Sequence, residues 1–573
     1  MVPVKQVTVL ASVGTILVVL SAVFMGIFPV IFSSIVNKML VLSEDGKTLD
    51  AFLKAPVPIY MQIYLFNVTN PDAIRYHGAK PVLQQVGPYT YLEVREKYNL
   101  DWNHTKGTVS YRQNISFFFN EEMSNGLKET DYITTINAVM VTVAAKIENL
   151  GPAVQAMAEL AFLRFKESLF ISRSVGELLF RGYKEPLLAE LAKYIGDPTN
   201  SNGRFGFFYP IAAQVFGTQN NLILNAVWSQ LEKGLDLFDR HTVGELLFDG
   251  FLLPEFDFDF SHLSPKLNFT QGWTGTIYEI LQKMGVSNIP AFLQENKLSL
   301  LFGRNDTNDG IHTVSTGEKD MSTYLETQEW NGKSALTYWN DQYCNMINGT
   351  DGSQYPPKVT KDTSLKIFTS ELCRSLYLTY EKEIKHNGIH AYRFTAPEKM
   401  LQAASENPDN ACYCYPDMNH CLGSGMLSLE PCAKGAKVIM STPHFYMGDK
   451  IELAKLVGLN PSKEEHETFL DVEPKTGVTM KAAKKIQINV PLRPYGNLPS
   501  FKNVPEVTFP ILWVNESADV NATVSKEVIK GVSLPFVVVN AICGTLIALG
   551  LVFLIVGGIK FSKIRRTHGQ QKL

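Results

Sequence analysis

One long apolar run near each end of the chain constrains its architecture more than any other feature. Residues 7–32 form 26 consecutive positions without a charged side chain, and residues 532–559 form 28. A helix rises about 1.5 Å per residue, so each run is long enough to cross the ~30 Å hydrocarbon core of a bilayer. We therefore predict two transmembrane helices, at 7–32 and 532–559, with one large domain between them.

The basic residues next to these runs predict the orientation of the chain. One lysine precedes the first run, four basic residues lie within seven positions after the second, and the tail 560–573 has no acidic residue. The positive-inside rule then places residues 1–6 and 560–573 in the cytosol, and residues 36–530 in the lumen or outside the cell. A cleaved signal peptide is the alternative for the first run. Its length and the lack of a small-x-small cleavage site favour a retained anchor.

Sequons and cysteines agree with an oxidising compartment for the central domain. Eight N-glycosylation sequons all fall between the two runs. They are at Asn67, Asn103, Asn114, Asn268, Asn305, Asn348, Asn515 and Asn521. Six cysteines crowd into 89 residues, at Cys344, Cys373, Cys412, Cys414, Cys421 and Cys432. An even set in such a compartment predicts three disulfides, whereas a zinc site at the middle three lacks the usual paired CxxC spacing.

Composition and motifs favour a binding domain over an enzyme. The whole chain is 45% hydrophobic and 19% charged, and its net charge of −3 is too small to indicate nucleic acid or another charged partner. There is no G-x-S-x-G, Walker loop, dinucleotide fingerprint or H-E-x-x-H. No cofactor and no metal site are therefore expected. A two-span cation channel is disfavoured, because Asn540 is the only amide in the core of the second run.

Local periodicity predicts both strands and helices in the central domain. Residues 59–68, 486–490 and 507–514 alternate as strands do, and residues 136–170 have helical spacing with a break at Gly151-Pro152. The helix after this break is apolar on more than one face, which indicates burial; an exposed contact surface is the alternative. SVGELLFRG at 174–182 recurs 68 residues later as TVGELLFDG at 242–250. This indicates a duplicated helical hairpin over about 209–300, or an artefact joining alternative exons.

Several phrases spread along the chain resemble one known family. They are FNVTNP (66–71), VGPYTY (86–91), VGELL (175–179), CNMINGT (344–350), CRSLY (373–377), PHF (443–445) and HETFLD (466–471). With the paired terminal runs, they make the chain similar to the class B scavenger receptors. These include fatty-acid translocase, the high-density-lipoprotein receptor and the lysosomal receptor for glucocerebrosidase.

The resemblance implies an α+β membrane protein with a large antiparallel β-barrel core. It further implies an apical helical bundle over about 136–300 and a lipid tunnel that runs through the barrel towards the membrane. The implied disulfides are Cys344–Cys412, Cys373–Cys432 and Cys414–Cys421. The function implied is a cell-surface receptor that binds lipoproteins, fatty acids or phospholipids and passes lipid to the membrane.

The tails and the predicted apex bear on location, partners and ligand capture. The tails lack the acidic dileucine signal of the lysosomal relative, which favours the plasma membrane; a lysosomal receptor that sorts an acid hydrolase is the alternative. The last three residues, 571–573, resemble a C-terminus that a PDZ domain binds. A homo-oligomer is a further possible assembly. Arg164 and Lys166, followed by Leu169 and Phe170, are the candidate ligand-binding residues. Cations beside an apolar mouth can pair with a carboxylate or phosphate, although a solvated helix end is the simpler alternative.

Overall fold

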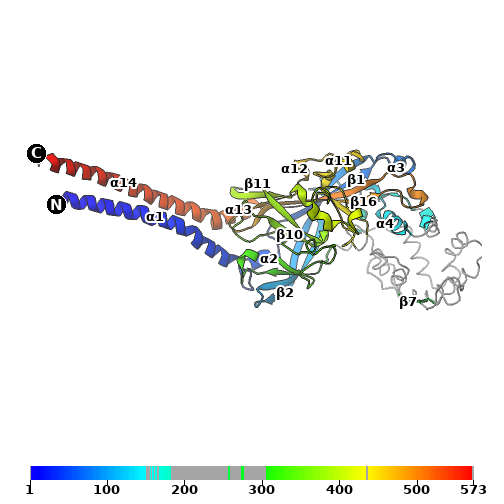
Figure 1. Cartoon of the computed structure of the whole chain (residues 1–573), viewed down its shortest axis with the longest axis horizontal. Helices are drawn as coiled ribbons and strands as arrows, with labels where there is room; N and C mark the ends of the chain where they lie inside the picture. Colours follow the sequence, from blue (N-terminus) through cyan, green and yellow to red (C-terminus); the bar gives the residue numbers. More distant parts are fainter. Residues whose placement is uncertain are drawn as a thin grey trace, which may run out of the picture.

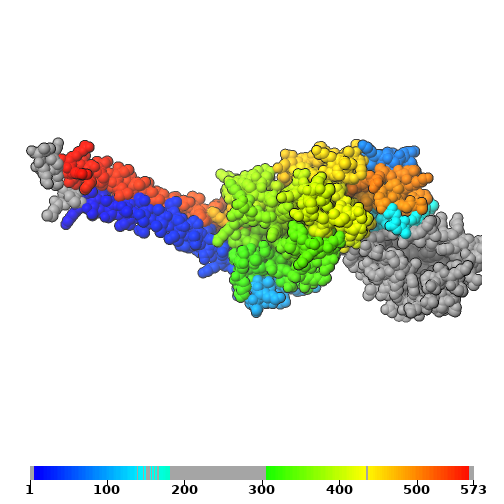
Figure 2. All heavy atoms as spheres, in the orientation of Figure 1, coloured from blue at the N-terminus to red at the C-terminus, as the bar shows by residue number. Residues whose placement is uncertain are grey.

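Two long helices run side by side away from the rest of the protein. The computed structural model describes residues 2–149, 155, 158–159, 162–163, 167–181, 256–258, 273–275, 305–433 and 436–570. Helices α1 (Val2–Leu40) and α14 (Leu534–Gln570) bring both ends of the chain to the same side (Figure 1). Figure 2 shows them as a narrow rod that projects from a broad outer domain. The predicted pair of apolar terminal helices is confirmed, and the second run begins in the π-helical turn Ile529–Ser533 that leads into α14.

Aromatic side chains join the two helices to the outer domain. Phe536 of α14 packs edge-on against Phe28 and Phe32 of α1, with ring centroids 5.2 and 4.8 Å apart. Lys475, in the turn before β16 (Thr479–Leu492), places its ammonium nitrogen 3.7 Å from the centroid of the Phe536 ring. A cation over an aromatic face is an attractive contact. The root of the helix pair therefore touches the domain directly.

The core of the outer domain is an antiparallel sheet that curls into a nearly closed barrel. Eleven of its thirteen described strands follow the order β10-β11-β12-β15-β16-β17-β1-β2-β3-β8-β9. Their bounds, after β16, are β10 (Leu365–Thr369), β11 (Arg374–His386), β12 (Ile389–Thr395), β15 (Phe469–Val472), β17 (Val507–Asp519), β1 (Ile59–Val68), β2 (Leu83–Asn103), β3 (Thr108–Phe119), β8 (Ile311–Ser315) and β9 (Thr327–Trp330). The predicted strands at 59–68, 486–490 and 507–514 lie in β1, β16 and β17 and are confirmed.

A short extended segment closes the seam between the two end strands. The Thr327 amide of β9 donates to the Gly349 carbonyl at 2.8 Å. The Thr350 amide donates to the Lys366 carbonyl of β10 at 3.1 Å, and the Phe368 amide returns a bond to Thr350 at 2.9 Å. These bonds satisfy strand edges that would otherwise present unpaired groups. Residues 349–350 thus act as a link between β9 and β10.

Shorter elements lie outside the barrel. β13 (Met426–Ser428) and β14 (Ile439–Ser441) form a flap on β16. The small helices are α2 (Leu49–Leu53), α3 (Pro71–His77), α11 (Lys450–Ala454), α12 (Lys463–His466) and α13 (Ala522–Val528). α13 connects β17 to the second membrane helix, so the end of β17 lies near the membrane and its start lies far from it (Figure 1).

The membrane-distal half of the barrel holds a large hydrophobic core. Its core contains Phe66, Tyr89, Tyr495, Phe501 and Phe509, all at most 1% exposed. Side chains from the apex, including Met140 and Val141 of α4 (Ala138–Ile147), join the same cluster. Burial of several aromatic rings is the main source of stability at such a site. The apex and the distal barrel are therefore one hydrophobic unit.

The apex differs from the sequence prediction at the ends of the helical stretch 136–170. Ile136 is the last residue of β4 (Tyr132–Ile136), and Phe170 is the first of β5 (Phe170–Ser174), where they pair with each other. Both are buried, and a β-branched and an aromatic residue suit a paired strand. Between them, α4 and the described residues 155, 158–159 and 162–163 are helical. Of the predicted bundle beyond residue 181, only β6 (Phe256–Phe258) and β7 (Trp273–Gly275) are described; the rest of the duplicated hairpin lies outside the described residues.

Candidate functional site: a cavity in the barrel

The membrane-proximal half of the barrel encloses a cavity of about 520 Å³. Its lining begins at Leu40, where α1 ends, and at Val524 and Val528 of α13. Along β16 it continues from Met480 to Ile486, six strand steps of about 3.3 Å, which is close to the length of a long acyl chain. Its volume is within the range of small-molecule sites. The cavity thus lies in the half of the barrel that faces the membrane.

Most of the cavity wall is apolar. Phe52, Ile59, Leu378, Leu470 and Met480 are among the residues that line it. They come from α2, β1, β11, β15 and β16, so the wall is assembled from segments far apart in the sequence. Such a surface favours an apolar ligand, at about 25 cal/mol for each Å² of apolar area removed from water.

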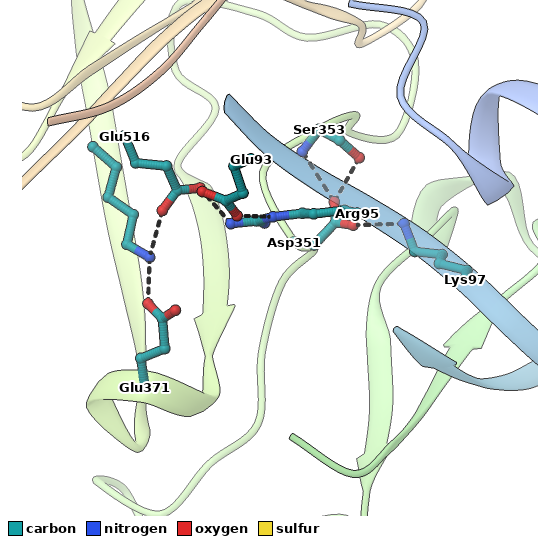
Figure 3. Close-up of polar contacts among 8 residues, drawn as sticks. Glu93, Arg95, Lys97, Asp351, Ser353, Glu371 and Glu516 are labelled. Atoms are coloured by element: carbon teal, nitrogen blue, oxygen red, sulfur yellow. Dashed lines mark hydrogen bonds and ion pairs between the residues drawn. The ribbon is translucent and has the colours of Figure 1, made fainter. Parts of the chain in front are cut away.

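A network of ion pairs crosses this wall, and we call it the charged belt: Glu93, Arg95, Glu371, Lys484 and Glu516 (Figure 3). Arg95 of β2 donates to Glu93 on its own strand and to Glu516 of β17, each at 2.5 Å. β1 lies between β2 and β17 in the sheet, so the guanidinium reaches across a whole strand. The belt therefore ties together neighbouring walls of the barrel.

The belt also holds a turn against the opposite wall. Lys484 of β16 donates to Glu371 at 2.6 Å and to Glu516 at 3.2 Å. Glu371 belongs to the 3-10 turn Ser370–Leu372, which lines the cavity. The turn is fixed on its other side, where the Ser370 hydroxyl donates to Asp309. Lys484 thereby bridges the sheet to a segment that follows β10.

Burial and neighbouring charges shift the pKa values of two carboxyl groups in the belt in opposite directions. Burial raises the pKa of Glu93 to about 7, and the nearby Glu516 carboxylate adds to this shift. Burial acts in the same direction on Glu516, but Arg95 and Lys484 outweigh it and lower the pKa of that carboxyl. One Glu93 oxygen, Oε2, has no hydrogen-bond partner in the described part of the chain. With two cations and three carboxylates the belt has a formal charge of −1, which becomes zero when Glu93 holds a proton.

A second buried pair lies beside the belt. Lys97 donates to Asp351 at 3.2 Å, and the backbone and hydroxyl of Ser353 donate to the same carboxylate at 3.0 and 2.6 Å. Burial opposes ionisation of Asp351, but Lys97 and Ser353 prevail and hold its pKa well below the usual range. The Lys97 ammonium also lies 4.7 Å from the ring centroid of Phe52. Arg95, Lys97 and Lys484 thus each have a carboxylate partner, whereas Lys485, which also lines the cavity, makes no ion pair with a described residue.

This arrangement suits an amphiphilic ligand, with a hydrocarbon chain and a polar group. The apolar wall can hold a hydrocarbon chain, and the belt offers paired charges to a polar group that is neutral or zwitterionic. The belt is not evident from the sequence, because Arg95 and Glu516 are 421 positions apart. One signal was present: Glu93, Arg95 and Lys97 alternate at the strand period, which places three charges on one face.

The predicted ligand-binding residues are placed differently from the cavity. Arg164 and Lys166 lie outside the described residues. Leu169 is 0% exposed and Phe170 8% exposed, and both belong to the packed distal core. Phe170 contacts Phe509 of β17, with ring centroids 6.0 Å apart. Leu169 and Phe170 therefore pack in the core below the apex. A ligand-binding role for Arg164, Lys166 and these two residues stays a prediction.

The structure contains two of the three implied disulfides. Cys344 is bonded to Cys412, and Cys414 to Cys421. Burial raises the pKa of Tyr338, and both Cys373 and Cys432 add to this effect, so the two remaining cysteines lie near the same ring. Their pairing stays a prediction.

The sequons differ in how their side chains are engaged. Asn268 lies outside the described residues, whereas Asn103, Asn305 and Asn521 are exposed. The Asn521 carbonyl oxygen accepts two backbone N–H groups at the start of α13, which leaves the amide nitrogen directed to solvent. In Asn515 the amide nitrogen itself is engaged, because it donates to Gln62 at 2.9 Å. A glycan on Asn515 would have to replace that bond. Glycosylation at all eight sequons, including the half-buried Asn67, Asn114 and Asn348, stays a prediction.

Comparison with known proteins gives a consistent set of relatives. The model of the CD36 family matches residues 12–221 and 210–561. Lysosome membrane protein 2 of Rattus norvegicus is 30% identical over 518 residues, which cover 90% of this chain and 86% of that protein. Its Homo sapiens counterpart is 29% identical over 520 residues, 90% of this chain and 86% of that protein. Scavenger receptor class B member 1 of Rattus norvegicus is 28% identical over 508 residues, 89% of this chain and 80% of that protein. The family match restarts at residue 210, close to the start of the predicted duplication.

Proposed function

Because the chain belongs to the CD36 family, whose receptors are non-enzymatic, we propose that it is a cell-surface receptor that binds lipoproteins, fatty acids or phospholipids. We further propose that it passes lipid through the barrel to the membrane. The observation that supports this most directly is the 520 Å³ cavity, which extends from the middle of the barrel to the roots of the two membrane helices.

The position of the cavity suggests how lipid leaves it. Leu40, Val524 and Val528 line its lower end, and each lies within a few residues of a membrane helix. A chain that moves out past these residues exchanges one apolar environment for another, so it avoids exposure to water. Net flow then follows the concentration gradient of the lipid and needs no hydrolysis.

Filling the cavity with a side chain tests this proposal. Ala482 of β16 lines the cavity, whereas its neighbour Lys481 does not and instead pairs with Asp519 at 2.8 Å on the outside of the barrel. Ala482→Trp should lower lipid uptake several-fold at equal surface expression, and Lys481→Trp should leave it near the wild-type rate. Normal uptake by a well-expressed Ala482→Trp receptor would contradict transport through this cavity.

A lysosomal receptor that binds and sorts an acid hydrolase is the second candidate. It is favoured by the similarity to Lysosome membrane protein 2, which at 30% identity is no weaker than the similarity to Scavenger receptor class B member 1 at 28%. Localisation of a tagged protein separates the two candidates. Residence in lysosomes with a co-purifying hydrolase would replace the surface-receptor proposal. A PDZ-domain partner at residues 571–573 and a homo-oligomer are further proposals, to be tested by the same purification.

A further inference from the structure

Arg374, the first residue of β11, is a buried cation without a carboxylate partner in the described part of the chain. It is 4% exposed. Its side chain makes one hydrogen bond with a described residue, from Nε to the Ser375 carbonyl at 3.5 Å. It makes no ion pair with a described residue. A guanidinium carries five N–H donors and keeps its charge in proteins. Because buried charges are normally paired, this one is unusual.

One tyrosine ring covers this guanidinium, and the phenol groups of two more lie close enough to affect its charge. Its central carbon lies 3.7 Å from the ring centroid of Tyr413. Burial lowers the pKa of Arg374, while the phenol groups of Tyr413, Tyr343 and Tyr377 act in the opposite direction. The Asp409 carboxylate acts on Tyr377 but is not among the charges that act on Arg374. Stacking on Tyr413 satisfies the face of the guanidinium but not its N–H edge.

The surroundings of Arg374 are held rigidly. The Cys344–Cys412 disulfide lies next in sequence to both Tyr343 and Tyr413. Trp339 packs edge-on against Tyr413 at 5.0 Å and donates its indole N–H to the Cys373 carbonyl at 2.6 Å. Groups fixed in this way lose little entropy when a ligand arrives.

The group is reachable from outside and separate from the cavity. Tyr343 is 56% exposed. Arg374 itself keeps a narrow contact with solvent, at 4% exposed. Leu372 and Leu376, on either side of it in the chain, line the cavity, whereas Arg374 does not. The guanidinium therefore lies beyond the lining of the cavity, against Tyr413 of the segment Pro408–Tyr413.

We propose that Arg374 and the phenol groups of Tyr343, Tyr377 and Tyr413 form a binding site for a phosphate or sulfate group, separate from the cavity. The planar N–H fork of arginine matches two oxygens of such an anion, and tyrosine hydroxyls can donate to the others. The anion would supply the charge partner that the described protein lacks. It is either free in solution or the terminal group of a larger molecule, such as a glycerophosphate headgroup.

Thermal unfolding of the full-length, detergent-purified protein tests the site. Sulfate stabilises proteins in general, so every variant should have a higher unfolding midpoint in sodium sulfate than in sodium chloride of equal ionic strength. In the wild type, a bound sulfate should add about 2–3 °C to this general effect. Arg374→Gln should lose this excess and keep the general effect. The matched control is Arg75→Gln, because Arg75 also lies over a tyrosine ring, Tyr76, but at the surface. Equal responses of the wild type and Arg374→Gln would overturn the proposal.

A second measurement keeps the proposal testable if Arg374→Gln does not fold. Calorimetric titration of the wild type with inorganic phosphate should show saturable binding, and Tyr413→Phe, which keeps the ring but loses the hydroxyl, should bind several-fold more weakly. Absence of saturable binding would overturn the proposal. Comparison with glycerol 3-phosphate identifies the source: equal binding indicates a headgroup-sized ligand, and binding of inorganic phosphate alone indicates a free anion.

Discussion

A Cβ atom added to Gly550 would lie 2.8 Å from the carbonyl oxygen of Gly14, so the two membrane helices meet backbone to backbone at these glycines. The reverse distance, from a Cβ on Gly14 to the Gly550 oxygen, is 2.7 Å. Within lipid, close approach of this kind is a main source of helix association, because van der Waals packing replaces the hydrophobic effect there. The two ends of the chain are therefore held together inside the membrane.

Cysteines at Leu10 and Gly557 should cross-link the two helices. A Cβ on Gly557 lies 3.6 Å from the Cβ of Leu10, a separation that suits a disulfide. In a Cys543→Ala background, Leu10→Cys with Gly557→Cys should oxidise, so that protease fragments of the cut outer domain stay linked without reductant. Leu10→Cys with Gly558→Cys is the control, since nothing lies within 4 Å of a Cβ at Gly558. Adding Gly550→Leu should abolish the cross-link; its persistence would show that the glycines do not set the pairing.

Gly349→Ala should open the seam of the barrel. Gly349 has φ +93°, and a Cβ there would lie 2.2 Å from the backbone carbon of Lys366 in β10. Gly352, with φ +87° and no atom closer than 3.9 Å, separates backbone strain from the clash. We expect Gly352→Ala to cost about 1–2 kcal/mol and Gly349→Ala at least ~3 kcal/mol, because β10 must move. Unfolding midpoints and surface expression measure this, and equal effects of the two substitutions would argue against the clash.

Ionisation of Glu93 should weaken the fold as pH rises. Its folded pKa of about 7 exceeds the ordinary value of 4.5, so between these pH values the folded chain binds more protons than the unfolded chain. The destabilisation caused by ionised Glu93 is absent below pH 4.5 and complete above about pH 7. Glu93→Gln should therefore gain about 1–3 kcal/mol in unfolding free energy relative to the wild type between pH 4.5 and pH 8. Glu96→Gln, at a 56% exposed side chain on the same strand, should follow the wild type; parallel curves for Glu93→Gln would refute the assignment.

Cys373 and Cys432 should form the third disulfide. Closing a loop of about 60 residues stabilises a fold by roughly 4 kcal/mol, so Cys373→Ser and Cys432→Ser should each lower the unfolding midpoint. The double substitution should cost no more than either single one, because both remove the same bond. Peptide mapping without reductant measures the pair directly. Two separately alkylated cysteines in the folded protein would disprove it.

Charge reversal at the apex should impair ligand capture. Arg164→Glu with Lys166→Glu should reduce uptake of fatty acids and anionic phospholipids several-fold, because a carboxylate or phosphate would meet repulsion instead of a cation. Surface expression should be unchanged. Reversal of two other lysines, Lys399 and Lys502, controls for net charge. Normal uptake by the apical variant would show that capture takes place elsewhere.

Local sequence patterns determined much of this protein. Run length predicts the two membrane helices, since a charge-free stretch of 26 or 28 residues is long enough to cross the hydrocarbon core of a bilayer. Alternation of apolar residues predicts β1 along its full length, 59–68, because side-chain direction in a strand depends only on neighbouring positions. The crowded cysteines predict a disulfide-linked region, and the structure bonds four of them there.

Tertiary structure alone decided the cavity and its belt. Glu93, Arg95 and Lys97 alternate as the polar face of an ordinary strand does, and nothing local distinguishes an inward face from an outward one. Closure of the sheet turned this face inward and brought Glu516, 421 residues away, to within 2.5 Å of Arg95. The free energy of such a pair depends on how many charges share the low-dielectric space, and only the folded chain sets that number.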